Sequence, residues 1–183
     1  MTNLVIQPSR STLALLGFIT ALICARGAWA CETHANEAWT KAAHVLNFVK
    51  FVEWPNELPN TIEICFSGAD DVRNSLASAV VGKSVGARSI VVRELTREEA
   101  HECHVLYLGS SGERNAAAKA AELPALTIGD AEDFTRRGGV IRLYKEHDRV
   151  QFSINIANAR RSGLQVSSNL LRLAASVEHE EGA

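Results

Sequence analysis

Short stretches rich in β-branched and aromatic residues alternate with stretches suited to helices, and this alternation constrains the fold of the 183-residue chain more than any other feature. The β-type stretches are TIEICFSG (61–68), SIVVREL (89–95), CHVLYLG (103–109) and ALTIGD (125–130). The helical stretches between them are DDVRNSLASAVVG, TREEAHE and ERNAAAKAAEL. Because strands that alternate with helices usually pair in parallel, the sequence predicts a compact α/β fold with a mainly parallel sheet flanked by helices.

The pattern changes in GGVIRLYKEHDRVQFSIN (138–155), which holds two runs of alternating apolar and polar residues. The runs, 140–144 and 150–154, flank the polar turn KEHDR. This arrangement predicts an antiparallel hairpin at the edge or end of the sheet.

The C-terminal stretch ANARRSGLQVSSNLLRLAASV (157–177) predicts two helical pieces that break near Gly163. Ser167 or Ser168 is the expected cap of the second piece, whose apolar stripe continues to Val177. No linker, internal repeat or low-complexity segment interrupts the chain, so we expect one folded domain.

The first thirty residues have the pattern of a secretory signal peptide. Arg10 precedes an apolar run at 13–25, an arginine closes the run, and small residues end at Ala30. The run is shorter than the roughly 20 residues that span a bilayer. We therefore expect residues 1–30 to be cleaved after Ala30, which leaves a domain of residues 31–183.

Cleavage would make Cys31 the first residue, and this position raises lipoprotein processing as an alternative. The bulky Trp29 stands where a lipidation signal has a small or aliphatic residue, so we expect a soluble exported product. Removal of the signal peptide discards two arginines and no acid, which changes the formal net charge from −2 to −4. Nucleic acid is not an expected partner, because a phosphate backbone requires a concentrated basic surface.

The exported chain keeps three cysteines, Cys31, Cys65 and Cys103, in a compartment where disulfides form. The stretch HECH (101–104), with Cys65 as a further ligand type, is one possible metal site. An oxidising compartment instead favours pairing of Cys103 with Cys65, and no second C-x-x-C or H-x-x-x-H motif supports a metal. We expect neither a metal nor a cofactor.

No catalytic constellation is assembled in the sequence, which lacks a G-x-S-x-G motif and any recognised nucleophile context. We expect three further histidines to be solvated and four scattered acids to sit mostly at helix starts. These residues are His44, His147 and His179, and Asp70, Asp71, Asp130 and Asp133. The chain is therefore interpreted as a binding protein and not as an enzyme.

The loop GSSGERN (109–115) offers glycines, serines and a helix start, which in a parallel sheet can hold an anion. It lacks the spacings of the known phosphate-binding loops, so a plain capped loop is the simpler interpretation. A small-ligand sensor that uses this loop remains an alternative function, and an undetected hydrolase is a third.

EAWTKAAHVLNFVKFVEWP (37–55) predicts a helix that ends at Pro55. Its polar residues recur every three or four positions and form one narrow stripe, which leaves a wide apolar surface. These polar residues are Thr40, Lys41, His44, Asn47 and Lys50. The stripe and the short length argue against a membrane span; we expect the helix body to pack in the core, with Trp54 either packed or available to a partner.

Several stretches together resemble the YfiR family of periplasmic regulators of membrane-bound diguanylate cyclases. They are KAAHVLNFVKFVEWP, ICFSG (64–68), CHVLYLG, LTIGD (126–130), GGVIRLY (138–144), VQFSIN (150–155) and ANARRSGLQVSSNLLRLA (157–174). The resemblance implies a periplasmic α/β protein, often a homodimer. It also implies a negative regulator that binds the periplasmic domain of a YfiN-like inner-membrane diguanylate cyclase, holds it inactive, and lowers cyclic di-GMP and biofilm formation. A YfiB-like outer-membrane lipoprotein is the implied antagonist.

The resemblance further implies that Cys65 and Cys103 form the structural disulfide of the family. The best-known member has a second cysteine pair near the hairpin, whereas residues 139–156 contain no cysteine here. This difference leaves the predicted hairpin held by its hydrogen bonds and packing alone.

The partner surface is predicted at the break between the two C-terminal helical pieces. Polar residues cluster there while neighbouring leucines are expected to be buried; the predicted contact residues are Arg160, Arg161, Gln165 and Asn169. Arginine is enriched at interfaces because its planar group pairs with carboxylates and stacks at the same time. A solvated helix face is the alternative interpretation.

Overall fold

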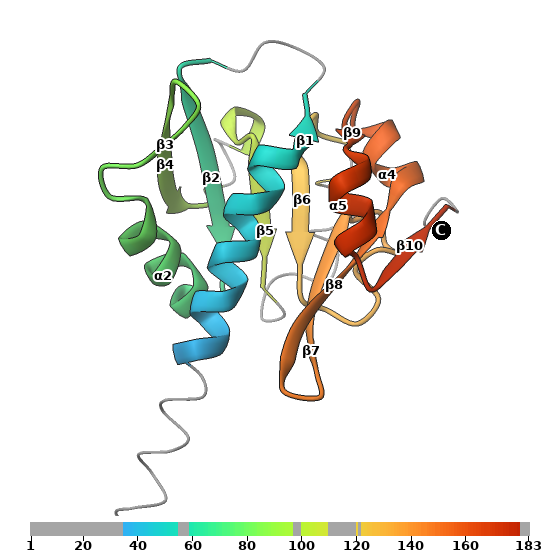
Figure 1. Cartoon of the computed structure of the whole chain (residues 1–183). Helices are drawn as coiled ribbons and strands as arrows, with labels where there is room; N and C mark the ends of the chain where they lie inside the picture. The colour runs from blue at the N-terminus through green and yellow to red at the C-terminus, as the bar shows by residue number, and fades with distance from the viewer. Residues whose placement is uncertain (1–34, 55–58, 97–99, 110–119, 121, 180–183) are drawn as a thin grey trace, which may run out of the picture. The chain divides into compact units, whose positions relative to one another are not determined.

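An eight-stranded mixed sheet forms the centre of the compact unit Ala38–Ala183 (Figure 1). The computed structural model describes residues 35–54, 59–96, 100–109, 120 and 122–179. In sheet order the strands are β10 (Ser176–Glu178), β8 (Arg149–Asn155), β7 (Ile141–Glu146), β6 (Leu126–Gly129), β5 (Val105–Leu108), β2 (Thr61–Ser67), β4 (Arg88–Glu94) and β3 (Ser84–Val85). Only β8–β7 and β4–β3 are antiparallel neighbours in this sheet. The predicted α/β fold with a mainly parallel sheet and an antiparallel hairpin is confirmed.

One face of the sheet carries the main hydrophobic core. Strand residues of alternating register, such as Phe66, Tyr107 and Ile128, project to this face and are buried. The N-terminal helix and α2 (Asp70–Val80) contribute to the same core, and Figure 1 shows the N-terminal helix crossing in front of the central strands. A second, smaller cluster includes Cys65, Cys103, Leu106, Leu108 and Phe134.

The N-terminal helix, which covers residues 35–51 among those described, packs in the core as the sequence predicted. Its buried residues are Ala38, Ala42, Val45, Phe48 and Val49. The helix ends at Phe51 and not at Pro55, because Val52 and Glu53 form strand β1 (Val52–Glu53). Trp54 is half-buried and packs against the core.

The predicted polar stripe of this helix is only partly exposed. Asn47 and Lys50 face solvent, but Thr40, Lys41 and His44 are half-buried. The exposed surface instead includes two large apolar side chains, Trp39 (51% exposed) and Phe51 (36% exposed). The long polar side chains can cover the edge of the core, which is why polarity alone misplaced the exposed stripe.

Two short strands form a separate antiparallel sheet that the sequence analysis missed. β1 pairs with β9 (Gln165–Val166), with Val52 opposite Val166. The backbone N–H of Ser167 also donates to the carbonyl oxygen of Phe51 over 3.1 Å. The C-terminal segment is thus joined to the end of the N-terminal helix.

The two helical pieces of the C-terminal stretch are confirmed as α4 (Ile156–Arg161) and α5 (Ser168–Leu173). The prediction that the second piece continues to Val177 is wrong, since the chain is extended from Ala174 and forms β10. β10 pairs in parallel with β8 and forms hydrogen bonds with the backbone groups on the outer side of β8. The β7–β8 hairpin therefore does not lie at the sheet edge, which was one of its two predicted positions.

Several predictions fall partly or wholly outside the described residues. These are the signal peptide (1–30), Cys31, Pro55, and the helix and loop residues at 110–119. Of the predicted helix at 96–102, the described part contains a 3-10 turn, Ala100–Glu102. Within the described segments, no helix is long and apolar enough to span a bilayer.

Candidate partner-binding groove

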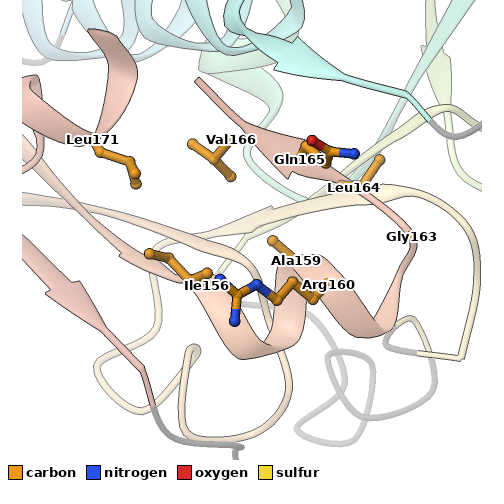
Figure 2. Close-up of a pocket in the computed structure, with 8 residues that line it drawn as sticks. All are labelled: Ile156, Ala159, Arg160, Gly163, Leu164, Gln165, Val166 and Leu171. Atoms are coloured by element: carbon orange, nitrogen blue, oxygen red, sulfur yellow. The ribbon is translucent and has the colours of Figure 1, made fainter. Parts of the chain in front are cut away.

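A groove of about 460 Å³ lies among α4, the turn that follows it, β9 and α5 (Figure 2). Its lining is mainly apolar, with one guanidinium and one side-chain amide, and none of the lining residues is acidic. The lining residues are Ile156, Ala159, Arg160, Gly163, Leu164, Gln165, Val166 and Leu171. A surface of this kind can accept an apolar group and pair with a carboxylate beside it.

Two residues shape the first part of the groove: an N-cap asparagine that starts α4, and a glycine with positive φ that ends the turn after it. Asn155 begins α4, and its side-chain oxygen accepts the backbone N–H of Asn158 over 3.0 Å. Gly163, with φ of 74°, ends the helical turn; its N–H donates to Arg160 and the next N–H donates to Ala159. This turn directs the chain back as β9, so α4 and β9 form two neighbouring walls.

Ser167 begins the third wall of the groove. Its hydroxyl oxygen accepts the backbone N–H of Leu170 over 3.3 Å, which caps α5 as the sequence predicted. Leu170 is buried in the core, and Leu171 is directed to the groove lining. The cap and the buried leucine together orient α5 against β9.

Asn158 attaches α4 to the loop that follows β6. Its buried amide nitrogen donates to the carbonyl oxygens of Thr135 (2.7 Å) and Gly139 (2.8 Å). The same loop places Phe134 against Gly129 and Gly139, where a Cβ would lie within 2.4 Å and 2.1 Å of the ring. The sequence analysis missed this role, because an asparagine inside a short helix gives no sequence signal for a distant carbonyl.

The structure places the four predicted contact residues on one exposed segment but brings only two of them to the groove. Arg160 and Gln165 line it, whereas Arg161 and Asn169 are exposed outside its lining. The side-chain oxygen of Asn169 is hydrogen-bonded to Arg172. The sequence analysis did not predict that the apolar lining residues come together, because β9 has only two residues and shows no apolar–polar alternation.

The groove has a cationic border at the end of α4. Arg160, which lines the groove, and the exposed Arg161 occupy the last turn of this helix. Each cation lies at the helix end where the backbone dipole favours positive charge. An acidic partner is electrostatically matched to this border.

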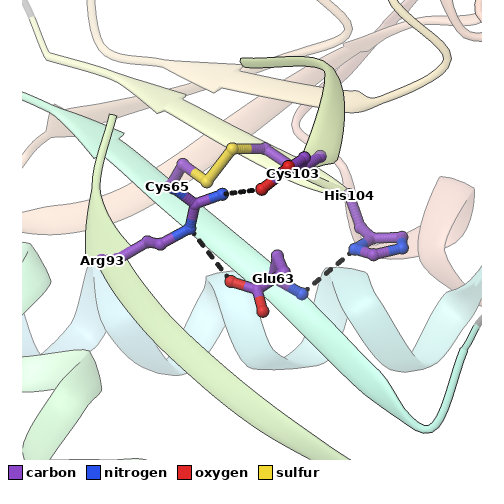
Figure 3. Close-up of polar contacts among 6 residues, drawn as sticks. Glu63, Cys65, Arg93, Cys103 and His104 are labelled. Atoms are coloured by element: carbon purple, nitrogen blue, oxygen red, sulfur yellow. Dashed lines mark hydrogen bonds and ion pairs between the residues drawn. A yellow bond between two sulfur atoms is a disulfide. The ribbon is translucent and has the colours of Figure 1, made fainter. Parts of the chain in front are cut away.

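A disulfide joins Cys65 in β2 to Cys103 just before β5, with Cα atoms 5.9 Å apart (Figure 3). It is the pair that the resemblance implied. Both cysteines are buried. The Arg93 guanidinium lies beside the pair and contacts Glu63 over 3.1 Å and Glu102 over 3.3 Å. The bridge therefore fixes the entry to β5 against the neighbouring strand.

Two half-buried histidines have lowered pKa values. His104 accepts the backbone N–H of Glu63 at Nδ1 over 3.1 Å; burial lowers the pKa of His104, and the nearby Glu63 carboxylate opposes this shift. Burial also lowers the pKa of His44, which contacts the rings of Phe48 and Phe152. The expectation that His44 is solvated is thus wrong, because its helix turns this position toward β8.

Other candidate ligands are dispersed. Among the described residues, no group of three or more histidine, cysteine or acidic side chains is arranged to hold a metal ion. Asp130 follows β6 and is itself followed by turns, so it does not start a helix as expected. Its carboxylate lies 3.8 Å from the Lys41 ammonium. His147 lies in the β7–β8 turn and His179 near the described C-terminal end, both exposed as predicted.

A family model described as YfiR/HmsC-like matches residues 39–175 of the chain, which include the whole groove and the disulfide. The chain belongs to the YfiR/HmsC-like family. Membership supports a role, in general terms, in the periplasmic regulation of diguanylate cyclase signalling. YfiR-like proteins are regulators and not enzymes.

Solved structures show weaker similarity to this YfiR/HmsC-like chain. One is a conserved domain protein from Vibrio cholerae O1 biovar El Tor, with 14% identity, a TM-score of 0.48 and coverage of 75% of this chain. Another is the ABC domain in complex with L-Trp from Streptococcus pneumonia, with 10% identity, a TM-score of 0.45 and 64% coverage. The chain spans 60% of the first structure's length and 54% of the second's.

Proposed function

We propose that this protein is a periplasmic negative regulator that binds the periplasmic domain of an inner-membrane, YfiN-like diguanylate cyclase and holds it inactive. Family membership supports the signalling role, and the groove with its cationic border is the observation that carries the binding proposal. Regulation follows if the protein binds the inactive conformation of the cyclase more tightly than the active one. A hundredfold shift requires only about 2.7 kcal/mol of preference.

The groove would receive an apolar side chain of the cyclase, with an acidic residue of the cyclase beside it. Val166 and Leu171, both half-buried, supply part of the apolar surface, and Arg160 can pair with the carboxylate. Arg161 and Asn169, exposed on the same segment, would extend the contact beyond the groove. A YfiB-like outer-membrane lipoprotein that competes for this protein would release the cyclase.

The proposal is tested by cyclic di-GMP levels in a strain that carries the cognate cyclase. Deletion of the gene should raise cyclic di-GMP, and Arg160→Glu or Arg161→Glu should raise it while the protein is still exported. Arg149→Glu is a matched control, because Arg149 is exposed at the opposite end of β8 from α4. No rise on deletion would defeat the inhibitor proposal. A rise on deletion, with no rise for either arginine variant, would place the contact elsewhere.

A small-ligand sensor is the second candidate, and the groove volume is what favours it. A space of about 460 Å³ falls within the range of small-molecule sites, roughly 300–1,000 Å³. Thermal unfolding in a metabolite panel tests it. A saturable rise in Tm that Leu171→Ala abolishes would support a ligand in the groove, and no rise across the panel would count against it.

A further inference from the structure

Backbone hydrogen bonds fix His104 on both sides, and its side chain makes a bond that only the neutral imidazole can make. The N–H of His104 donates to the carbonyl oxygen of Glu63 over 3.0 Å, and its carbonyl oxygen accepts the N–H of Leu126 over 2.9 Å. The half-buried ring accepts the backbone N–H of Glu63 at Nδ1 over 3.1 Å. Protonation would place a hydrogen on Nδ1 and leave two donors facing each other.

The charged groups around His104 offer its protonated form another partner. Burial lowers the pKa of His104, and the Glu63 carboxylate opposes this shift. The same carboxylate lies 3.1 Å from Arg93 of β4, and Arg93 also contacts Glu102 of the 3-10 turn over 3.3 Å (Figure 3). Trp54, which follows β1, carries no charge, and β6 contains none. A protonated imidazole would therefore compete with Arg93 for the Glu63 carboxylate and give up the backbone N–H.

Trp54 connects His104 to the groove. The two rings are in a T-shaped arrangement with centroids 6.4 Å apart, which is a favourable geometry for an aromatic pair. Trp54 directly follows Glu53, which pairs with Gln165 of β9. Gln165 and Val166 both line the groove. One ring contact and one strand pair thus separate the imidazole from a wall of the groove.

We propose that neutral His104 is a positioning residue of the groove, and that its protonation weakens the binding of a partner there. In the neutral form, the ring is held by the Glu63 backbone and supports Trp54. In the protonated form, the ring turns to the Glu63 carboxylate, and Trp54 loses this support together with the β1–β9 pair. Because each charge state favours one arrangement, a fall in pH shifts the population from the first to the second.

Amide hydrogen exchange on the mature, disulfide-bonded protein at about pH 7.5 and about pH 5 tests this coupling, with each rate corrected for the intrinsic effect of pH. The Glu63 amide reports the bond to His104, and the Ser167 amide, which donates to the end of the N-terminal helix, reports the β1–β9 pair. Both should lose protection by about threefold to tenfold at the lower pH, as expected for one hydrogen bond. The Gly109 amide, which donates to Ser67 at the other end of β5, should not change.

Three variants separate the titration of His104 from other effects of pH. His104→Asn supplies an acceptor oxygen that does not titrate, so it should remove the loss of protection at Ser167. His101→Asn is the matched control, because His101 is exposed in the same segment, and it should keep that loss. Trp54→Ala tests the connection: the response to pH should remain at Glu63 and disappear at Ser167.

Binding of the periplasmic domain of the cyclase at the same two pH values extends the test to the groove, and this part rests on the proposed function. The wild-type Kd should rise about threefold to tenfold at the lower pH, and His104→Asn should show a smaller rise. Unchanged protection at Glu63, a loss at Ser167 that His104→Asn retains, a loss at Glu63 that does not reach Ser167, or an equal rise in Kd for both proteins would each overturn the proposal. Absence of binding at both pH values would defeat the proposed function instead, and hydrogen exchange would still decide the role of His104.

Discussion

Asn158→Ala should be among the most destabilising single substitutions outside the hydrophobic core. The Asn158 side chain is 1% exposed and donates two short hydrogen bonds, to Thr135 and Gly139. Alanine leaves both carbonyl oxygens buried without these donors, at a cost of about 1–3 kcal/mol each. We expect the free energy of unfolding to fall by about 2–5 kcal/mol, a large part of the 5–15 kcal/mol typical of a domain.

Urea unfolding followed by circular dichroism measures this loss. Asn74→Ala is the matched control, because Asn74 is exposed on α2 and surface substitutions usually change stability by less than about 0.5 kcal/mol. For a domain of this size, the Asn158 variant should also unfold roughly 5–15 °C lower than the wild type. A loss below about 1 kcal/mol would refute the assignment of Asn158 as the anchor between α4 and the loop.

Four further predictions concern the disulfide, the histidines, the loop glycine and the N-terminus. Replacing Cys65 and Cys103 by serine should cost about 4 kcal/mol from the loop of 38 residues, while Cys31→Ser should cost nothing measurable; urea unfolding compares them. The free energy of unfolding should fall as the pH drops below about 6.5, because the lowered pKa values of His104 and His44 mean that the unfolded chain binds protons at a higher pH than the folded one. His104→Asn should weaken the dependence of the urea unfolding midpoint on pH between pH 7 and 5, and an unchanged dependence would contradict this. Gly139→Ala should lower Tm, because the added Cβ meets the Phe134 ring. The control Gly82→Ala has open space around the added Cβ, so it should lower Tm only through the strain of its positive φ. Mass spectrometry should find an N-terminus at Cys31 without lipid, and a diacylglyceryl mass would place the protein on a membrane.

The strands and helices that could be predicted are those with strong local patterns. β2, β4, β5 and β6 are short apolar runs between helical stretches, and the β7–β8 hairpin has clear alternation around a polar turn. β1, β9 and β3 have two residues each, which is too few for any periodicity. β10 was predicted as helix because the apolar spacing through Val177 fits a helix, whereas pairing with β8 decided its conformation.

The candidate site could be predicted only in its polar part. Arg160 and Gln165 were found because a helix break with arginines is visible in sequence, and the resemblance pointed to the Cys65–Cys103 pair. The apolar lining depends on the return of the chain at Gly163 and on the pairing of β9 with β1, both of which are tertiary features. The contacts of Asn158 join residues 19 and 23 positions apart, and no local rule predicts them.

The most direct test of the proposed inhibition is the rate of cyclic di-GMP synthesis by the full-length cognate cyclase in nanodiscs, where both membrane faces are accessible. Addition of the purified mature protein should lower the rate in a saturable manner, and Arg160→Glu should shift the half-maximal concentration upward by about tenfold or more, as expected for the loss of a charge-assisted contact. Arg149→Glu should inhibit as the wild type does. A synthesis rate that the wild-type protein leaves unchanged at saturating binding would contradict inhibition itself.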